Sequence, residues 1–185
     1  MNYLRGFIPW IAFAAVGSAH WQWGAVTALA VAAWFFYNDR KRGISGDSLM
    51  LEQSTIAFFA VLSIIAFASP DSGLREYGGA LATGWLALTA WATLAVRRPF
   101  TTGIAKRQAP REVWNHPVFI RINVVLTTVW AAAFTLTAAG LAVIEAESLG
   151  SAASIAVQAA GFAIPAFITA QYPERARRAA AQKAA

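Results

Sequence analysis

Charged and aromatic side chains suited to binding lie together in one segment, residues 97–121. It holds six Lys and Arg residues against one acid, and three prolines interrupt it. Phe100, Trp114 and Phe119 are the rings among these charges, and we expect them to enter the lipid interface. This mixture is typical of a segment that lies on an anionic membrane surface, where each cation contributes about 1 kcal/mol of binding. The alternative is an ordinary connecting loop whose charges only set the orientation of the chain.

Groups for catalysis or metal binding are scarce elsewhere. The chain has no cysteine, which excludes disulfides and thiol chemistry. His20 and His116 are expected on opposite sides of a membrane, and neither has a carboxylate at ligand spacing, so metal and bis-histidine haem sites are not expected. We therefore expect no catalytic residue, no cofactor and no enzymatic activity.

The acids fall where membrane surfaces are expected. Glu145 and Glu147 fit a loop on the outer side, and Glu52 fits the inner edge of the third apolar helix, near Arg40–Arg42. Inside the apolar runs Gln158 is a polar side chain that we expect to be buried midway along the last helix. The fifth helix carries Asn123, Thr127, Thr128, Thr135 and Thr137. Such residues usually form hydrogen bonds between helices. A polar path for a small solute is the alternative.

Five stretches without a charged residue must position these groups. They are Gly6–Asn38, Gln53–Pro70, Tyr77–Val96, Ile122–Ile144 and Ser148–Pro173. A helix needs about 20 apolar residues to cross a bilayer. With 58% hydrophobic and 13% charged residues, the chain leaves no room for a separate soluble domain.

The first apolar run is too long for one straight crossing, because it would extend about 50 Å against a bilayer core of about 30 Å. A break with two glycines and two tryptophans occupies residues 17–24. Splitting the run there predicts an all-α transmembrane bundle of six helices, and five is the alternative if Gly6–Asn38 is one tilted helix. The six are Phe7–Ala19, Trp21–Tyr37, Ser54–Ala68, Gly78–Val96, Ile122–Ile144 and Leu149–Ala170.

Residues 1–185 are then one integral membrane domain, with a basic cytoplasmic loop over 97–121 and a basic cytoplasmic tail over 171–185. Of the 15 Lys and Arg residues, all but Arg75 fall on one side of this topology. The positive-inside rule therefore predicts that both termini are cytoplasmic. The same rule explains the net charge of +6 without a nucleic-acid partner.

Small residues at four-residue spacing indicate how the helices pack in lipid. The last helix carries Ala152, Ala156 and Ala160 in one row. We expect this row to form internal packing of the monomer, and dimerisation through it is the alternative.

Several short motifs together resemble the intracellular septation protein A family of small bacterial inner-membrane proteins. They are Phe7-Ile8-Pro9, Arg97-Arg98-Pro99, Pro110-Arg111-Glu112-Val113-Trp114, Asn123, Trp130 and Pro173. The segment Asn115–Arg121 is additional to the family pattern, so the chain resembles a divergent relative. The resemblance implies a bacterial inner-membrane protein with a role in cell-envelope integrity or septation and no established enzymatic activity.

Together these features predict a non-enzymatic membrane protein with a structural or interaction role. Its expected partners are the bilayer, anionic lipid at the cytoplasmic face, and other membrane proteins or a second copy. A small transporter or channel with a polar path along the fifth and sixth helices is the alternative. The expected interaction residues are Arg97, Arg98, Pro99, Phe100, Lys106, Arg107, Arg111, Trp114, Asn123 and Trp130.

Overall fold

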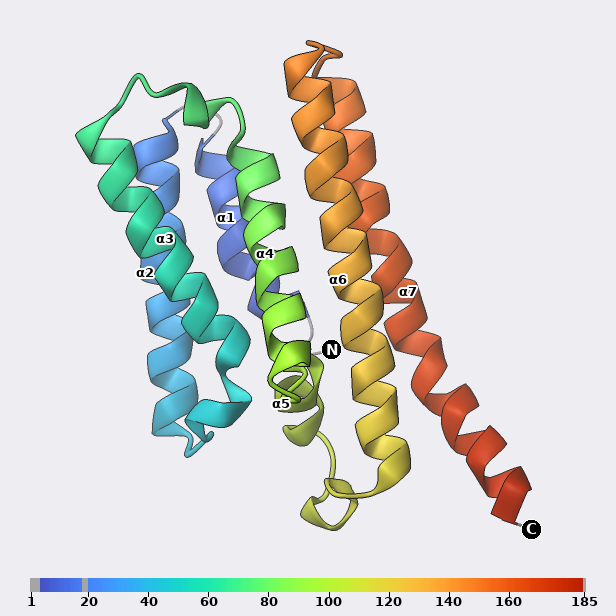
Figure 1. Ribbon diagram of the computed structural model, residues 1–185. Coiled ribbons are helices and arrows are strands. Elements are labelled where there is room, and N and C mark those ends of the chain that lie inside the picture. The colour runs from blue at the N-terminus through green and yellow to red at the C-terminus, as the bar shows by residue number, and fades with distance from the viewer. Residues whose placement is uncertain (1–3, 18–19, 185) are drawn as a thin grey trace. The chain divides into compact units, whose positions relative to one another are not determined.

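A computed structural model describes residues 4–17 and 20–184, and every regular element within them is helical. The expected all-α class is confirmed. The α-helices are α1 (Ile8–Gly17), α2 (Trp21–Lys41), α3 (Met50–Ala68), α4 (Gly78–Ala95), α5 (Phe100–Lys106), α6 (Pro117–Ala146) and α7 (Ser151–Ala184) (Figure 1). Four short 3-10 turns accompany them: η1 (Leu4–Phe7), η2 (Gly46–Ser48), η3 (Gly73–Arg75) and η4 (Arg111–Val113). Two compact units, Met1–Ala82 and Thr83–Ala185, are described separately below.

The predicted break in the first apolar run is present. His20 has an extended backbone between α1 and α2, so Gly6–Asn38 is not one helix and the five-helix alternative is wrong. The short helix α5 lies within the predicted loop. The predicted tail also differs, because α7 continues through residues 171–184. Within the described residues there are thus seven α-helices instead of six.

Three helices are long and apolar enough to cross a membrane: Met50–Ala68, Pro117–Ala146 and Ser151–Gln182. α4 and α5 would make a fourth span if they are taken as one helix pair, which is bent by 82°. By length and composition, the described part of the chain therefore has three to four candidate spans, as a membrane protein requires.

In the first unit, α2 packs against both α1 and α3. Gly24, Ala28 and Ala32 form a buried row along α2 at four-residue spacing. A Cβ atom added to Gly24 would lie 2.6 Å from the Cα atom of Gly17 on α1, so the two backbones touch there. Small residues allow this close approach, which supplies the van der Waals attraction that joins helices in lipid.

Aromatic rings fill the space between α1 and α3. The ring of Trp10 stacks on Phe58 with centroids 5.1 Å apart and lies 4.8 Å from the ring of Phe59. Such pairs add about 0.5–1.5 kcal/mol to the burial of their surface. At the other end of the unit, Trp21 Nε1 donates to the carbonyl oxygen of Pro70 at 2.9 Å, which connects the start of α2 to the segment after α3.

In the second unit, α6 and α7 form a long helix pair with Trp130 at its centre. Trp130 is 2% exposed, and its Nε1 donates to Thr169 Oγ1 at 2.9 Å. Its ring meets that of Phe162 edge to face, with centroids 5.1 Å apart. Next to them, Gly161 faces Thr137 so closely that a Cβ atom on Gly161 would lie 1.9 Å from Thr137 Oγ1.

The prediction that Ala152, Ala156 and Ala160 form the internal row of the last helix is wrong. All three are exposed. Val157 and Gly161 face α6 instead. Val157 and Gly161 each come one residue after a member of the alanine row, which corresponds to a rotation of about 100° around the helix. The row that faces α6 is the one whose neighbours, Phe162 and Thr169, contact Trp130.

Candidate functional site

The basic segment begins with a strained turn at the end of α4. The amides of Arg97 and Arg98 donate to the carbonyl oxygens of Leu94 (2.9 Å) and Thr93 (2.8 Å), the hydrogen-bond pattern of a Schellman helix end. Arg97 has a φ of 56°, in the left-handed region. A residue with a side chain loses about 1–2 kcal/mol in that conformation, and glycine does not. Strain of this kind often marks a functional position.

After this turn, a buried hydroxyl network holds α5 against α6. Thr101 is 0% exposed, and its hydroxyl donates to the carbonyl oxygen of Asn123 at 2.9 Å. The Thr127 hydroxyl, 2.8 Å from Thr101 Oγ1, is therefore the donor to Thr101. Asn123 Nδ2 donates in turn to the carbonyl oxygen of Phe119 at 2.9 Å. Each such bond contributes about 1 kcal/mol, so the network fixes the elbow between the two helices.

The ten predicted interaction residues separate into two sets by exposure. The exposed or half-exposed set is Arg97, Arg98, Lys106, Arg107, Arg111 and Trp114. The buried set is Pro99, Phe100, Asn123 and Trp130. We call the exposed set, all on the connection between α4 and α6, the basic connection. None of the buried residues forms part of this surface: Asn123 belongs to the network between α5 and α6, and Trp130 packs against α7.

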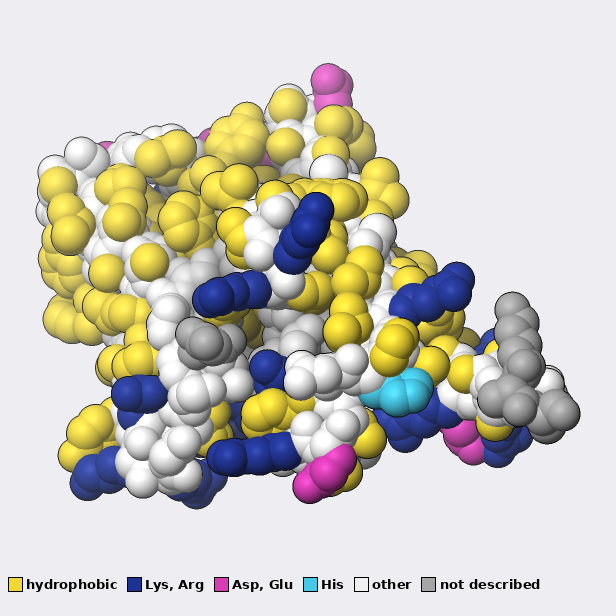
Figure 2. All heavy atoms as spheres, turned by 60° about the horizontal axis from the view of Figure 1, so that its bottom comes forward, with side chains coloured by type: hydrophobic (Ala, Val, Ile, Leu, Met, Phe, Trp, Pro, Cys, Tyr) yellow, Lys and Arg dark blue, Asp and Glu magenta, His cyan; other side chains and the backbone are white. Residues whose placement is uncertain are grey.

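Trp114 organises two cations of the basic connection. The Lys106 ammonium lies 4.9 Å from the Trp114 ring centroid, and the Arg111 guanidinium lies 5.7 Å from it. Trp114 Nε1 donates to the carbonyl oxygen of Ala109 at 3.0 Å, which fixes the ring. A cation over an aromatic face gains about 0.5–1 kcal/mol at an exposed site. Figure 2 shows Lys and Arg side chains standing among hydrophobic ones on the face it brings forward.

The expectation that three rings of this segment enter the lipid interface is wrong for two of them. Phe100 is 4% exposed and Phe119 is 8% exposed. Both are buried within the protein, because α5 packs on the first turns of α6 instead of lying free on the bilayer surface. Trp114, which is half-exposed, is the ring that remains for an interfacial contact.

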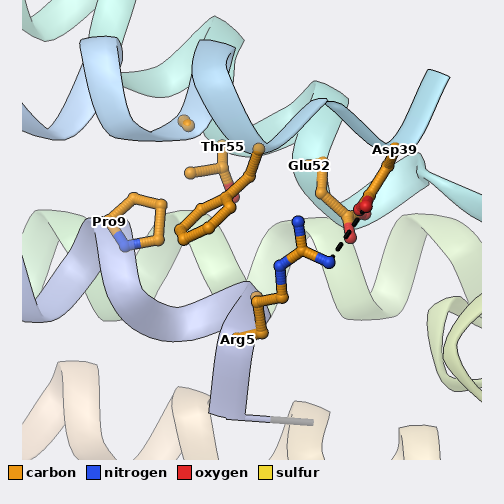
Figure 3. A pocket seen from close by; sticks show the side chains of 8 residues that line it. Arg5, Pro9, Asp39, Glu52 and Thr55 are labelled. Carbon is orange, nitrogen blue, oxygen red and sulfur yellow. Dashed lines mark ion pairs between the residues drawn. The ribbon is translucent and has the colours of Figure 1, made fainter. Parts of the chain in front are cut away.

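A second group, in the first unit, was missing from the sequence interpretation. Arg5 Nη1 lies 3.0 Å from Asp39 Oδ1, and the Arg5 guanidinium lies 4.7 Å from the centre of the Phe35 ring. Asp39 is 1% exposed and Glu52 is 8% exposed. Figure 3 shows the two carboxyl groups close together, facing Arg5. Glu52 stands in the first turn of α3, the expected inner edge of that helix, but its side chain is buried and faces Arg5 (Figure 3).

We call Arg5, Asp39 and Glu52 the buried charge cluster. With Pro9 and Thr55 it lines a cavity of about 10 Å³, roughly the space that one water molecule needs. The cluster joins the turn η1 to the end of α2 and the start of α3. Ionisable groups buried among membrane helices are functional candidates by default.

The predicted membrane depth of these three residues could have identified the cluster from the sequence. Arg5 immediately precedes the first apolar run, Asp39 immediately follows it, and Glu52 immediately precedes the next run. In the predicted topology these three boundaries fall at the same membrane surface. Side chains at equal depth on neighbouring helices are in reach of one another, whatever their separation along the chain.

The residues expected along a polar path have other roles. Thr127 belongs to the elbow network. Thr135 Oγ1 donates to the carbonyl oxygen of Ala131 at 2.8 Å and accepts from Trp91 Nε1 at 3.1 Å. Gln158 is exposed on α7, so the expectation that it is deeply buried is wrong. It follows Val157, which faces α6, and therefore points about 100° away from that contact.

Comparison of the chain with known protein families, with curated proteins and with solved structures finds no match. The resemblance to the intracellular septation protein A family therefore stays a prediction that depends on the short motifs.

Proposed function

We propose that this chain is a non-enzymatic integral membrane protein whose basic connection docks on anionic lipid at the cytoplasmic leaflet and serves as an interaction surface. The observation that carries the proposal is the exposed cationic set between α4 and α6, positioned by a buried elbow. The helix that follows this set, α6, is long and apolar enough to cross a bilayer, and α4 before it qualifies when it is taken together with α5. A role in the bacterial inner membrane, in envelope maintenance or septation, rests on the motif resemblance.

The energetics of the surface support lipid docking. Each exposed cation near an anionic leaflet contributes about 1 kcal/mol, and salt screens the attraction over about 10 Å. Arg97, Lys106 and Arg111 alone would then contribute about 3 kcal/mol. Orientation needs fewer charges, because the predicted cytoplasmic side also carries Arg40–Arg42 and the basic end of α7. The strained backbone of Arg97 also indicates that this cation does more than set the orientation, since a glycine there would form the turn without strain.

Lipid-dependent stability tests this proposal. Purified full-length protein is unfolded thermally in mixed micelles with a rising fraction of anionic phospholipid, because a ligand that binds the folded state raises Tm. We expect Arg111→Gln to reduce this gain in Tm, more at low than at high salt. Arg75→Gln is the matched control, since it removes one exposed cation at the opposite predicted surface. Equal gains in Tm for both variants would reduce the basic connection to an orientation signal.

Crosslinking tests the interaction role in the cell. A photoreactive residue in place of Arg111 is expected to capture lipid or a specific membrane protein, and the same residue in place of Arg75 is the control. Identical products at the two positions would argue against a dedicated surface.

Transport is the second candidate function, and the buried charge cluster favours it. Ionisable groups inside membrane bundles often mark ion or proton paths. Liposomes that contain only the purified protein provide the test. Proton or cation flux that Glu52→Gln abolishes would place transport first, and an absence of flux would leave the cluster as a structural ion pair.

A further inference from the structure

A groove with two arginines lies between the start of α6 and the last turns of α7. Arg121 and Ile122 of α6 line it together with Tyr172, Arg175 and three alanines of α7. Its volume of about 440 Å³ is within the range of roughly 300–1,000 Å³ typical of small-molecule sites. The wall is apolar apart from the two guanidinium groups and the Tyr172 hydroxyl.

The charge of the groove is positive and is not neutralised by its own lining. None of the described lining residues is acidic. Arg121 is exposed and has no ion-pair partner among the residues that the structure describes. Arg175 donates to the neutral Gln171 Oε1 at 2.6 Å, and Glu174 is paired with Arg178. Neither of the two guanidinium groups that line the groove is therefore neutralised by a carboxylate of the described residues.

The sequence predicts that the groove lies at the depth where a bilayer has its phosphates. Arg121 immediately precedes the charge-free stretch Ile122–Ile144 of α6. That stretch is about 34 Å long as a helix, enough to cross the hydrocarbon core. On α7, Tyr172 stands next to the end of the apolar part, and tyrosines favour the headgroup region. Both arginines thus lie just outside the predicted core.

The apolar surface of α7 continues from the groove into the predicted core. Ile168 and Ile164 precede Tyr172 by four and eight residues, so they lie on the same side of the helix. Ile164 is 60% exposed and Ile168 is half-buried. A ligand with an anionic head and hydrocarbon tails matches a basic groove that continues into an apolar helix surface, and it does so better than a free anion.

We propose that the groove binds an anionic phospholipid, with its phosphate between Arg121 and Arg175 and its acyl chains along the apolar surface of α6 and α7. The guanidinium fork matches phosphate oxygens, and basic pockets between membrane helices on the cytoplasmic side are typical sites for anionic headgroups. The inference rests on the proposed function, because this end must lie in the cytoplasmic leaflet. It adds one specific site to a general cationic surface.

Titration of the full-length protein with a fluorescent short-chain phosphatidylglycerol, in micelles of uncharged detergent, tests the site. We expect Arg121→Gln with Arg175→Gln to weaken binding about 30-fold, or about 2 kcal/mol, the value of two cations at a lipid surface. The matched control, Arg42→Gln with Arg177→Gln, removes the same charge outside the groove and is expected to change binding less than about threefold. Ala176→Trp keeps both cations but fills the groove, so it should also weaken binding.

Three outcomes would overturn the site. Equal weakening in the two double variants would mean that only net charge matters. If inorganic phosphate displaces the probe at the same concentration as unlabelled glycerophospholipid does, the groove is a site for free anions. Parent protein that binds phosphatidylglycerol and phosphatidylcholine equally would exclude an anion-selective groove. The proposed function fails separately, through Arg111→Gln and the lipid-dependent Tm, because Arg111 does not line the groove. Circular dichroism and gel filtration establish that each variant is folded.

Discussion

Gly24→Ala is expected to destabilise the first unit because α1 and α2 touch through their backbones at this residue. The new Cβ atom would lie 2.6 Å from Gly17 Cα and 2.7 Å from Gly17 N. Neither atom belongs to a side chain that can rotate away, so α1 itself must move. Overpacking typically costs about 1–3 kcal/mol, and a backbone obstacle belongs at the upper end. Alanine recovers about 0.5–1 kcal/mol as the better helix former, which leaves a net loss of about 2 kcal/mol.

Thermal unfolding of the purified chain in detergent, followed by its helical circular dichroism, measures this loss. A change of 1 kcal/mol corresponds to roughly 2–4 °C for a chain of this length, so Tm should fall by about 4–8 °C. Gly73→Ala is the control, because nothing lies within 4 Å of its added Cβ atom. Its Tm should stay within about 2 °C of the parent, as for most surface substitutions. A Gly24→Ala protein as stable as the parent would refute the backbone contact.

Three other substitutions test separate contacts by the same unfolding measurement. Gly161→Ala would place a Cβ atom 1.9 Å from Thr137 Oγ1, so we expect a loss of about 1–3 kcal/mol that adding Thr137→Ala largely restores; a loss that persists would contradict the contact. Arg5→Gln removes the ion pair with the buried Asp39 carboxylate and should cost about 1.5–3 kcal/mol, the value of a charged hydrogen bond, and adding Asp39→Asn should recover part of it. Arg97→Gly removes the left-handed strain and should raise stability by about 1 kcal/mol; no gain would mean that the turn is unstrained.

Most helix positions could be predicted because interruptions of the apolar pattern mark them. The polar break over residues 17–24 correctly separated α1 from α2. α5 was not predicted, since its seven residues are too few for a helical period to show. The sequence predicts too early an end for α7, because its charged last turns resemble a disordered tail. Alanine-rich, charged sequences are nevertheless good helix formers.

Which face of a membrane helix packs inward was harder to predict. Apart from Gln158, α7 is apolar or small on every side through its first half, so lipid-facing and protein-facing residues hardly differ in polarity. The row Ala152, Ala156 and Ala160 therefore looked as suitable as the row through Val157 and Gly161. The choice between them depends on contacts of Trp130 and Thr137 on another helix, which no local pattern contains.

The basic segment could be identified because its charges adjoin one another in the chain, and several of its cations are exposed. Phe100 and Asn123 were assigned to the surface, but both are buried at the α5–α6 elbow. That elbow depends on Thr101, which stands in no recognisable motif. The buried charge cluster was not predicted, because its members come from three separate elements, η1, α2 and α3.

Labelling of single cysteines shows whether the basic connection faces the cytoplasm, on which the lipid-docking proposal depends. The chain has no cysteine, so Arg111→Cys and Asp71→Cys each introduce one thiol into an otherwise unreactive protein. Both positions are exposed. In intact cells, a membrane-impermeant maleimide is predicted to label the Asp71→Cys protein, and to label the Arg111→Cys protein only after the membrane is permeabilised. Labelling of the Arg111→Cys protein in intact cells would contradict the orientation and the docking of this surface on the cytoplasmic leaflet.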